Sequence, residues 1–185
     1  MLDKEKISKN LKGFVKTGQK YGFVTDGLID ALGRDLLIAP ASTSTDYYGA
    51  FEGGLLQSTL NITKYAVALN ATLPEELQAE AGSLVKVCFL HQIGKAKLYV
   101  PLVSDWHNKK GIMYDFNNEL TSMTVGERSI YYAQSNGVTF TEDEYQAILN
   151  YGKGDDDKQA KLHTNKLGQL LKAAILMVGI EEKPL

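Results

Sequence analysis

The side chains of this sequence that are best suited to chemistry are one histidine and two long cations. His91 and Lys95 lie in the segment FLHQIGK, and Arg128 follows in the segment GERS. A lysine and an arginine can hold a phosphate group through charge-assisted hydrogen bonds without any metal. Each can also extend to solvent or pair with an acid, and a single histidine on an apolar helix is more often a hydrogen-bonded core residue. These residues suggest an anion or metal site but fit a structural role as well.

Other polar groups have weaker claims to a site. The aspartates at 155–157 lack the alternating spacing of a calcium loop, so they fit a solvated connector better. Trp106 and His107 fit either a binding edge or a lid that packs on the helices, and both interpretations stay open. Cys88 is the single cysteine and lies in an apolar run, so no internal disulfide and no cysteine-based zinc site is expected.

Composition limits the class of protein. The chain has 185 residues, 44% hydrophobic and 23% charged, which fits a single domain covering residues 1–185. Its formal charge of −2 provides no general positive field for a nucleic-acid backbone. The first residues are charged, and no stretch has the length and apolar character of a membrane span. We therefore expect a protein that stays in the cytoplasm.

Hydrophobic periodicity predicts helices in the first half of the chain. An amphipathic helix is predicted over about residues 3–17, with Gly18 ending it. A second helix is predicted from Thr25 to near Gly33, followed by a loop over residues 35–54 that is rich in glycine, serine and threonine. A third helix, over residues 55–69, carries apolar residues at steps of three and four.

Capping signatures predict the helices that follow. The spacing of a capping box occurs at three pairs: Thr72 with Glu75, Thr124 with Glu127, and Thr141 with Glu144. The first pair is expected to begin a helix that is almost wholly apolar over residues 84–90. Residues 97–117 instead predict a small β-hairpin with Gly111 in its turn. After a polar connector at 153–158, a last helix carries an apolar face from Leu167 to Val178. The expected class is all-α, a helical bundle with a hairpin insertion at about residues 97–117.

The order of several motifs resembles a known family. They are Ile38–Thr43 (IAPAST), Tyr48–Leu56 (YGAFEGGLL), Phe89–Lys95 (FLHQIGK), Gly126–Ser129 (GERS) and Ala147–Gly152 (AILNYG). These segments, within about residues 23–178, are similar to the small stand-alone HD-domain phosphohydrolases of phages and bacteria. The resemblance implies an HD-domain-like helical fold and hydrolysis of a phosphate ester, often in a nucleotide, by metal ions held among helices.

The positions that hold the metal in that family carry other residues here. Ser58 stands where the family has its first metal-binding histidine, and His91–Gln92 stands for the family's His–Asp pair. Val125 and Asn150 stand for two later histidines, and Ile175 stands for the closing aspartate. A hydrocarbon side chain donates no lone pair to an ion, and an amide is a weaker ligand than a carboxylate. Because His91 alone remains, we expect no catalytic residue, no bound metal and no other cofactor.

The leading hypothesis is therefore a pseudoenzyme, a catalytically inactive HD-domain-like protein that acts as a binding or regulatory module and fits a phage-encoded role. Its pocket candidates are Tyr48, Glu52, Lys95 and Arg128. Tyr48 stands where the family often has a loop histidine, and with Tyr47 it is predicted to fill the vacated space. The expected partner is a protein, a second copy of the chain or a nucleotide, and neither a membrane nor nucleic acid in general.

Two alternatives stay open. The first is a divalent-metal-dependent nucleotide phosphohydrolase with an unusual ligand set that includes His91, Glu52 and one of Asp105 or His107. The second is a metal-free protein that binds a nucleotide without hydrolysis, through Lys95 and Arg128. The first predicts bound metal and phosphate release, whereas the second predicts only that a ligand stabilises the fold.

Overall fold

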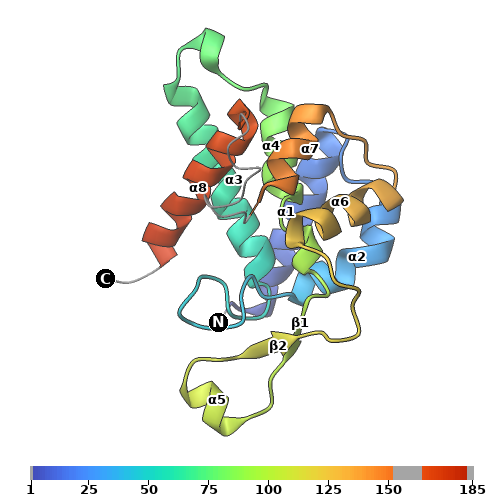
Figure 1. Ribbon diagram of the computed structural model, residues 1–185, viewed down its shortest axis with the longest axis vertical. Helices are drawn as coiled ribbons and strands as arrows, with labels where there is room; N and C mark the ends of the chain where they lie inside the picture. Colours follow the sequence, from blue (N-terminus) through green and yellow to red (C-terminus); the bar gives the residue numbers. More distant parts are fainter. Residues whose placement is uncertain (1, 152–163, 183–185) are drawn as a thin grey trace.

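Helices dominate the computed structural model, which describes residues 2–151 and 164–182 (Figure 1). In chain order the α-helices are α1 Lys4–Lys20, α2 Asp26–Ile38, α3 Gly54–Thr72, α4 Ala81–Leu90, α5 Asp105–Lys109, α6 Val125–Ser135, α7 Glu142–Leu149 and α8 Lys166–Glu182. Two short 3-10 helices, η1 Glu75–Leu77 and η2 Ile93–Lys95, flank α4. Strands β1 Tyr99–Pro101 and β2 Tyr114–Phe116 form an antiparallel pair. The prediction of a mostly helical protein with a small hairpin is confirmed.

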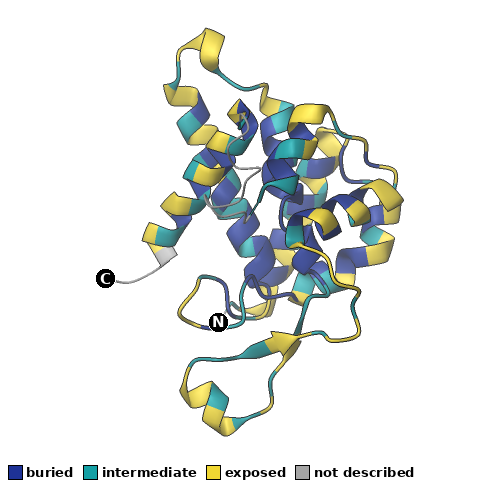
Figure 2. Ribbon diagram, viewed as in Figure 1, coloured by how far each residue is buried: buried dark blue, intermediate teal, exposed yellow. Residues whose placement is uncertain are grey.

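The apolar core surrounds α4. Six of its ten residues, including Val87, Cys88 and Phe89, are buried, as the unbroken apolar run in the sequence predicts. The ring of Phe89 stacks on Phe14 of α1 at a centroid distance of 5.0 Å and meets Phe23 edge-on at 5.5 Å. Helices α3 and α8 pack against each other and against α4, and Figure 2 shows buried residues concentrated where these helices meet. Burial of this apolar surface is the main stabilising term of the fold.

The first two helices run further than predicted. Helix α1 passes through Gly18 and ends at Lys20, after which Gly22 makes the turn with a φ of 74°. Helix α2 is capped by Thr25, whose hydroxyl accepts from the Leu28 amide at 3.1 Å, as the sequence predicts. It continues past Gly33 to Ile38 because the last turn buries Leu36 against the core, which outweighs the low helix propensity of one glycine.

The capping box predicted at Thr72 and Glu75 is wrong. Helix α3 continues through Thr72, whose hydroxyl donates to the Leu69 carbonyl at 2.7 Å. Leu73 is extended, with φ −77° and ψ 150°, because a residue that precedes a proline is pushed away from helical geometry. Helix α4 begins only at Ala81, where the Glu80 carboxylate accepts from two backbone amides of the first turn.

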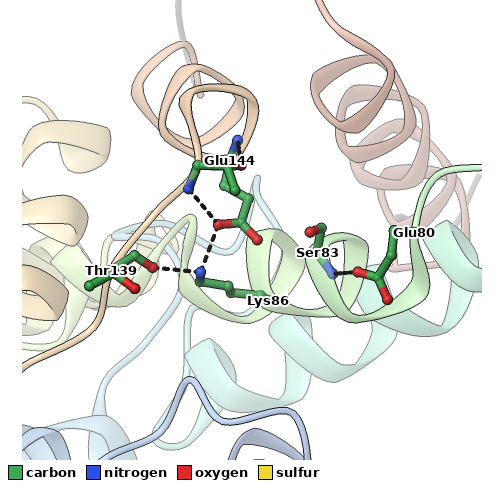
Figure 3. A network of polar contacts seen from close by, with 6 residues as sticks. Glu80, Ser83, Lys86, Thr139 and Glu144 are labelled. Carbon is green, nitrogen blue, oxygen red and sulfur yellow. Dashed lines mark hydrogen bonds and ion pairs between the residues drawn. The ribbon is translucent and has the colours of Figure 1, made fainter.

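The other two capping boxes are present. The threonine hydroxyl and the third-residue glutamate bond reciprocally at Thr124 with Glu127 and at Thr141 with Glu144. The Glu144 carboxylate also accepts from Lys86 of α4 at 2.6 Å, and the same ammonium donates to the Thr139 carbonyl at 2.6 Å (Figure 3). This largely buried ion pair joins α4 to the start of α7.

The hairpin projects from the bundle at the lower edge of Figure 1. Its two strands form the predicted hairpin, in which Tyr99 lies opposite Phe116, but helix α5 lies between them where a glycine-containing turn is predicted. Gly111, with a φ of 76°, follows α5 and leads back into β2. The returning chain is tied to the loop after α2, because the Thr43 carbonyl accepts from the Met113 amide at 2.8 Å. Hairpin and loop therefore form one connected wall.

In the described part of the chain, no helix combines the length and apolar character that crossing a membrane requires. The polar connector predicted at 153–158 lies outside the described residues. The final helix is confirmed as α8, which buries Leu167, Leu171 and Val178.

Candidate functional site

His91 lies at the C-terminal end of α4 and is fully buried. Its Nδ1 is 2.8 Å from the Cys88 carbonyl, so Nδ1 carries the hydrogen and donates, leaving Nε2 as an unprotonated nitrogen. Nε2 is buried and has no hydrogen-bond partner among the described residues. Burial lowers the pKa of His91 to about 3, because a charged imidazolium is poorly solvated there. The ring is therefore neutral at physiological pH.

Gln92 uses its side chain to join two helices. Its Nε2 donates to the hydroxyls of Thr59 at 3.0 Å and of Ser58 at 3.3 Å, both on α3. Its Oε1 accepts from the Lys95 ammonium at 3.4 Å. The structure thus brings together Ser58, His91 and Gln92, three of the positions that the family resemblance singles out. Thr59 is a member of this cluster that the sequence does not signal. Its hydroxyl donates to the Leu55 carbonyl and accepts from the Gln92 amide.

Lys95 is buried, with 8% of its surface exposed, although its side chain ends in an ionisable amine. Its ammonium donates to the Ala41 carbonyl at 2.8 Å and to the Tyr151 hydroxyl at 3.2 Å, besides Gln92. All three partners are neutral, and within residues 2–151 and 164–182 no carboxylate forms an ion pair with it. Burial lowers the pKa of Lys95, while the hydroxyls of Tyr48 and Tyr99 act in the opposite direction.

Tyr151 connects the histidine to the lysine. Its ring meets the His91 ring edge-on at a centroid distance of 4.6 Å, and its hydroxyl interacts with Lys95 and Tyr48. Burial raises the pKa of Tyr151 to about 12, so it stays a neutral hydroxyl. The family resemblance instead singles out the preceding residue, Asn150, which lies at the C-terminal cap of α7. Nothing in the local pattern distinguishes the two positions, because helix ends are uncertain by one or two residues.

A partly open pocket of about 270 Å³ lies beside Lys95. It is lined by Lys95, by Ser42 and Thr43 from the loop after α2, and by Tyr47, Tyr48 and Tyr99. Tyr99 comes from β1, so the wall formed by loop and hairpin positions the pocket. Tyr47 is 62% exposed at this pocket, whereas Tyr48 is partly buried against the core and its side chain interacts with Tyr151. That the two rings fill the space of a lost histidine stays a prediction.

The remaining predicted positions surround this site or lie apart from it. Val125 begins α6, and its carbonyl lies 2.5 Å from where a Cβ on Gly94 would be, so α6 packs directly on η2. Ser129 of α6 donates to the His91 carbonyl at 3.0 Å and accepts from the Gly94 amide. Ile175 packs against the apolar core from α8. These helices hold the backbone around His91 without supplying an ionisable group.

Two of the predicted pocket residues have other roles. The Arg128 guanidinium is buried on α6 and donates from Nη2 to the Thr121 carbonyl, while its Nε has no partner among the described residues. Glu52 is exposed and raises the pKa of Tyr114 on β2, after the larger effect of burial. Neither lines the pocket beside Lys95, so the predicted pair of Lys95 and Arg128 does not form one anion site there.

The groups around His91 do not fit a divalent ion. The Gln92 amide presents N–H groups to the α3 hydroxyls, and hydroxyls are weak ligands compared with carboxylates and imidazoles. Across the described part of the chain, no three His, Cys, Asp or Glu side chains gather closely enough to hold a metal. The alternative ligand set is therefore not assembled: Asp105 and His107 lie on α5 in the hairpin, and Glu52 is exposed.

With this geometry established, the chain was compared with known proteins. No family model, no curated protein and no solved structure matches it. The assignment of function therefore depends on the chemistry of the residues themselves.

Proposed function

We propose that this chain is a catalytically inactive HD-domain-like protein, a pseudoenzyme that acts as a binding or regulatory module. The observation that supports this most strongly is the hydrogen bonding of Gln92. In the resembling family this position is the aspartate of the His–Asp pair, whose carboxylate binds the catalytic metal. Here the amide donates to Thr59 and Ser58, and Ser58 itself stands where that family has a histidine.

These replacements bear directly on metal-assisted catalysis. Metal-assisted hydrolysis needs an ion that polarises the phosphoryl oxygen and activates a water molecule. The polar side chains of Ser58, Thr59 and Gln92 are neutral, and the Gln92 amide donates to both hydroxyls. They are therefore weak ligands for such an ion. His91 itself offers one imidazole nitrogen, and its ring is fully buried beneath Tyr151. A single nitrogen of this kind favours a structural residue over a general base or a metal ligand.

Binding is assigned to the neighbouring pocket instead. This pocket is partly open, whereas His91 and Gln92 have no exposed surface, so a ligand reaches Lys95 without reaching the histidine. The metal ligands of the resembling family are replaced here, while the pocket beside Lys95 stays partly open. This combination fits a protein that recognises a ligand or partner without converting it. The same proposal includes a cytoplasmic location, a phage-encoded role and binding to a protein partner.

The test is a combined metal and activity assay on the purified chain. We expect no stoichiometric Mn, Fe, Ni, Zn or Mg by elemental analysis, and no phosphate release from a panel of nucleotides with each metal added. Phosphate release that tracks the protein through purification and is lost in His91→Ala would contradict the proposal. His107→Ala then shows whether the alternative ligand set includes the half-exposed histidine of α5.

A further inference from the structure

We propose that the pocket beside Lys95 is a metal-free oxyanion site that takes a phosphate group, either as free phosphate or as the phosphomonoester end of a larger ligand. The inference rests on the proposed binding function and names the class of ligand.

The ammonium of Lys95 has no counter-ion among the described residues. It is 8% exposed, and its hydrogen-bond partners are a carbonyl, an amide oxygen and a phenol hydroxyl. The other ion pairs of the described chain show the usual solution, since Lys86 meets Glu144 and Lys97 meets Asp35. A buried charge without an opposite charge costs free energy, because neutral dipoles replace its hydration only in part. An anion bound in the pocket would supply the missing opposite charge.

The pocket walls carry hydroxyl groups that can donate to that anion. Tyr99 and Thr43 are among the residues that line the pocket, and within the described residues the hydroxyl of neither side chain makes a hydrogen bond. Ser42 is already committed, since it donates to the Tyr48 carbonyl at 2.9 Å. Among the described residues no acidic side chain lines the pocket, so there a bound oxyanion meets the Lys95 ammonium and neutral groups. The same composition disfavours a cation.

Size restricts the ligand. A volume of about 270 Å³ lies just below the range of about 300–1,000 Å³ that is typical of sites for drug-sized ligands. A tetrahedral oxyanion, or a phosphate carried on a group that extends to solvent, fits a pocket of this size. The exposed ring of Tyr47 lies at this pocket and is placed to contact such an attached group.

The experiment is isothermal titration calorimetry and thermal unfolding of the full chain with inorganic phosphate, at ionic strength held constant with chloride. We expect saturable binding and a rise in Tm that follows the occupancy of the site. Lys95→Gln is expected to weaken phosphate binding by roughly tenfold or more, since a charge-assisted hydrogen bond is lost. Lys97→Gln is the matched control, because Lys97 is 41% exposed and pairs with Asp35, and we expect its affinity within about twofold of the parent chain.

A second variant keeps the test decisive if Lys95→Gln does not fold. Tyr99→Phe retains the ring and removes only the hydroxyl, and we expect it to weaken phosphate binding by about three- to tenfold while the unliganded Tm stays close to that of the parent. Absence of saturable phosphate binding in the parent chain, or equal losses in Lys97→Gln and Lys95→Gln, would overturn the oxyanion site.

Further arms identify the source of the phosphate and separate the two proposals. Tighter binding of a nucleoside monophosphate than of inorganic phosphate, with no binding of the nucleoside, indicates a phosphomonoester ligand; equal binding indicates free phosphate. Binding of neither phosphate species, with no turnover, rejects this site but leaves the catalytically inactive module standing. Turnover of the monophosphate rejects the inactive module even if the anion binds at Lys95.

Discussion

At the scale of single residues, burial decides the chemistry of the site. His91 and Lys95 are both bases whose pKa is lowered mainly by desolvation. His91 is therefore neutral, and its Nδ1 donates to the Cys88 carbonyl. The lysine has three hydrogen-bond partners and so remains in place as a donor. One ring, Tyr151, contacts both.

The buried histidine predicts an acid-sensitive fold. The pKa of His91 falls from 6.5 in the unfolded chain to about 3 in the folded protein, so between these values the unfolded chain binds the extra proton. Stability from this residue is complete above pH 6.5 and is lost as the pH falls towards 3, by up to about 1.4 kcal/mol per pH unit.

The check is urea unfolding of the parent and of His91→Leu from pH 7 to pH 4. The carboxylates titrate in both proteins, so the difference in unfolding free energy between them isolates His91. We expect this difference to shift steadily against the parent as the pH falls. A difference that does not change with pH would show that His91 is protonated, or exposed, in the folded state.

At the scale of elements, the described helices are held together by a few close contacts in addition to the apolar core. The Lys86 ammonium connects α4 to α7, and both partners are largely buried. Helix α6 meets the end of α7 so closely that only a glycine fits at position 126. Either contact can be tested against a matched residue elsewhere in the same chain.

Removing Lys86 should destabilise the protein strongly. Lys86→Met leaves the Glu144 carboxylate buried without its partner, and we expect a loss of about 3–5 kcal/mol of unfolding free energy. Lys97→Met breaks an ion pair whose side chains are 41% and 35% exposed, so about 1 kcal/mol or less is expected. Chemical denaturation measures both, and similar losses would mean that the Lys86 pair is solvated.

Gly126 and Gly13 give opposite predictions for the same substitution. A Cβ at Gly126 would lie 2.5 Å from the Ile148 carbonyl oxygen, so Gly126→Ala should cost about 1–3 kcal/mol. A Cβ at Gly13 of α1 meets nothing within 4 Å, so Gly13→Ala should stabilise the helix by up to about 1 kcal/mol. Urea midpoints that move in the same direction would refute the packing of α6 on α7.

At the scale of the whole molecule, the bundle and the projecting hairpin carry different tasks. The core is built from residues of α1–α4 and α6–α8, whereas no residue of α5 is buried. Trp106 of α5 is 60% exposed, and Lys110 lies 3.8 Å over its ring. Of the two roles open for Trp106, this exposure favours an edge over a lid packed on the helices.

Shortening the hairpin should leave the bundle folded. Leu102 and Met113 face each other, since the Leu102 amide donates to the Met113 carbonyl, so residues 103–112 can be replaced by a two-residue Asn-Gly turn. We expect unchanged helical circular dichroism and a loss of roughly 1–2 kcal/mol, from contacts such as the Thr45 amide bond to the Gly111 carbonyl. Loss of cooperative unfolding would instead assign the hairpin tip to the core.

The helical class, the hairpin and the caps at Thr124 and Thr141 could be predicted from the sequence alone, because these depend on local periodicity and on hydrogen bonds between residues three apart. The sequence also places His91, Gln92 and Lys95 in one short segment, although the predicted partner of Lys95 is Arg128. The surroundings of these residues are set by tertiary contacts. The hydroxyls of Ser58 and Thr59, the Ala41 carbonyl and the Tyr151 ring come from segments distant in the chain. Burial depends on those long-range contacts, and no local pattern encodes it. It keeps His91 neutral, and it encloses Lys95 at a place where no described residue supplies a counter-ion.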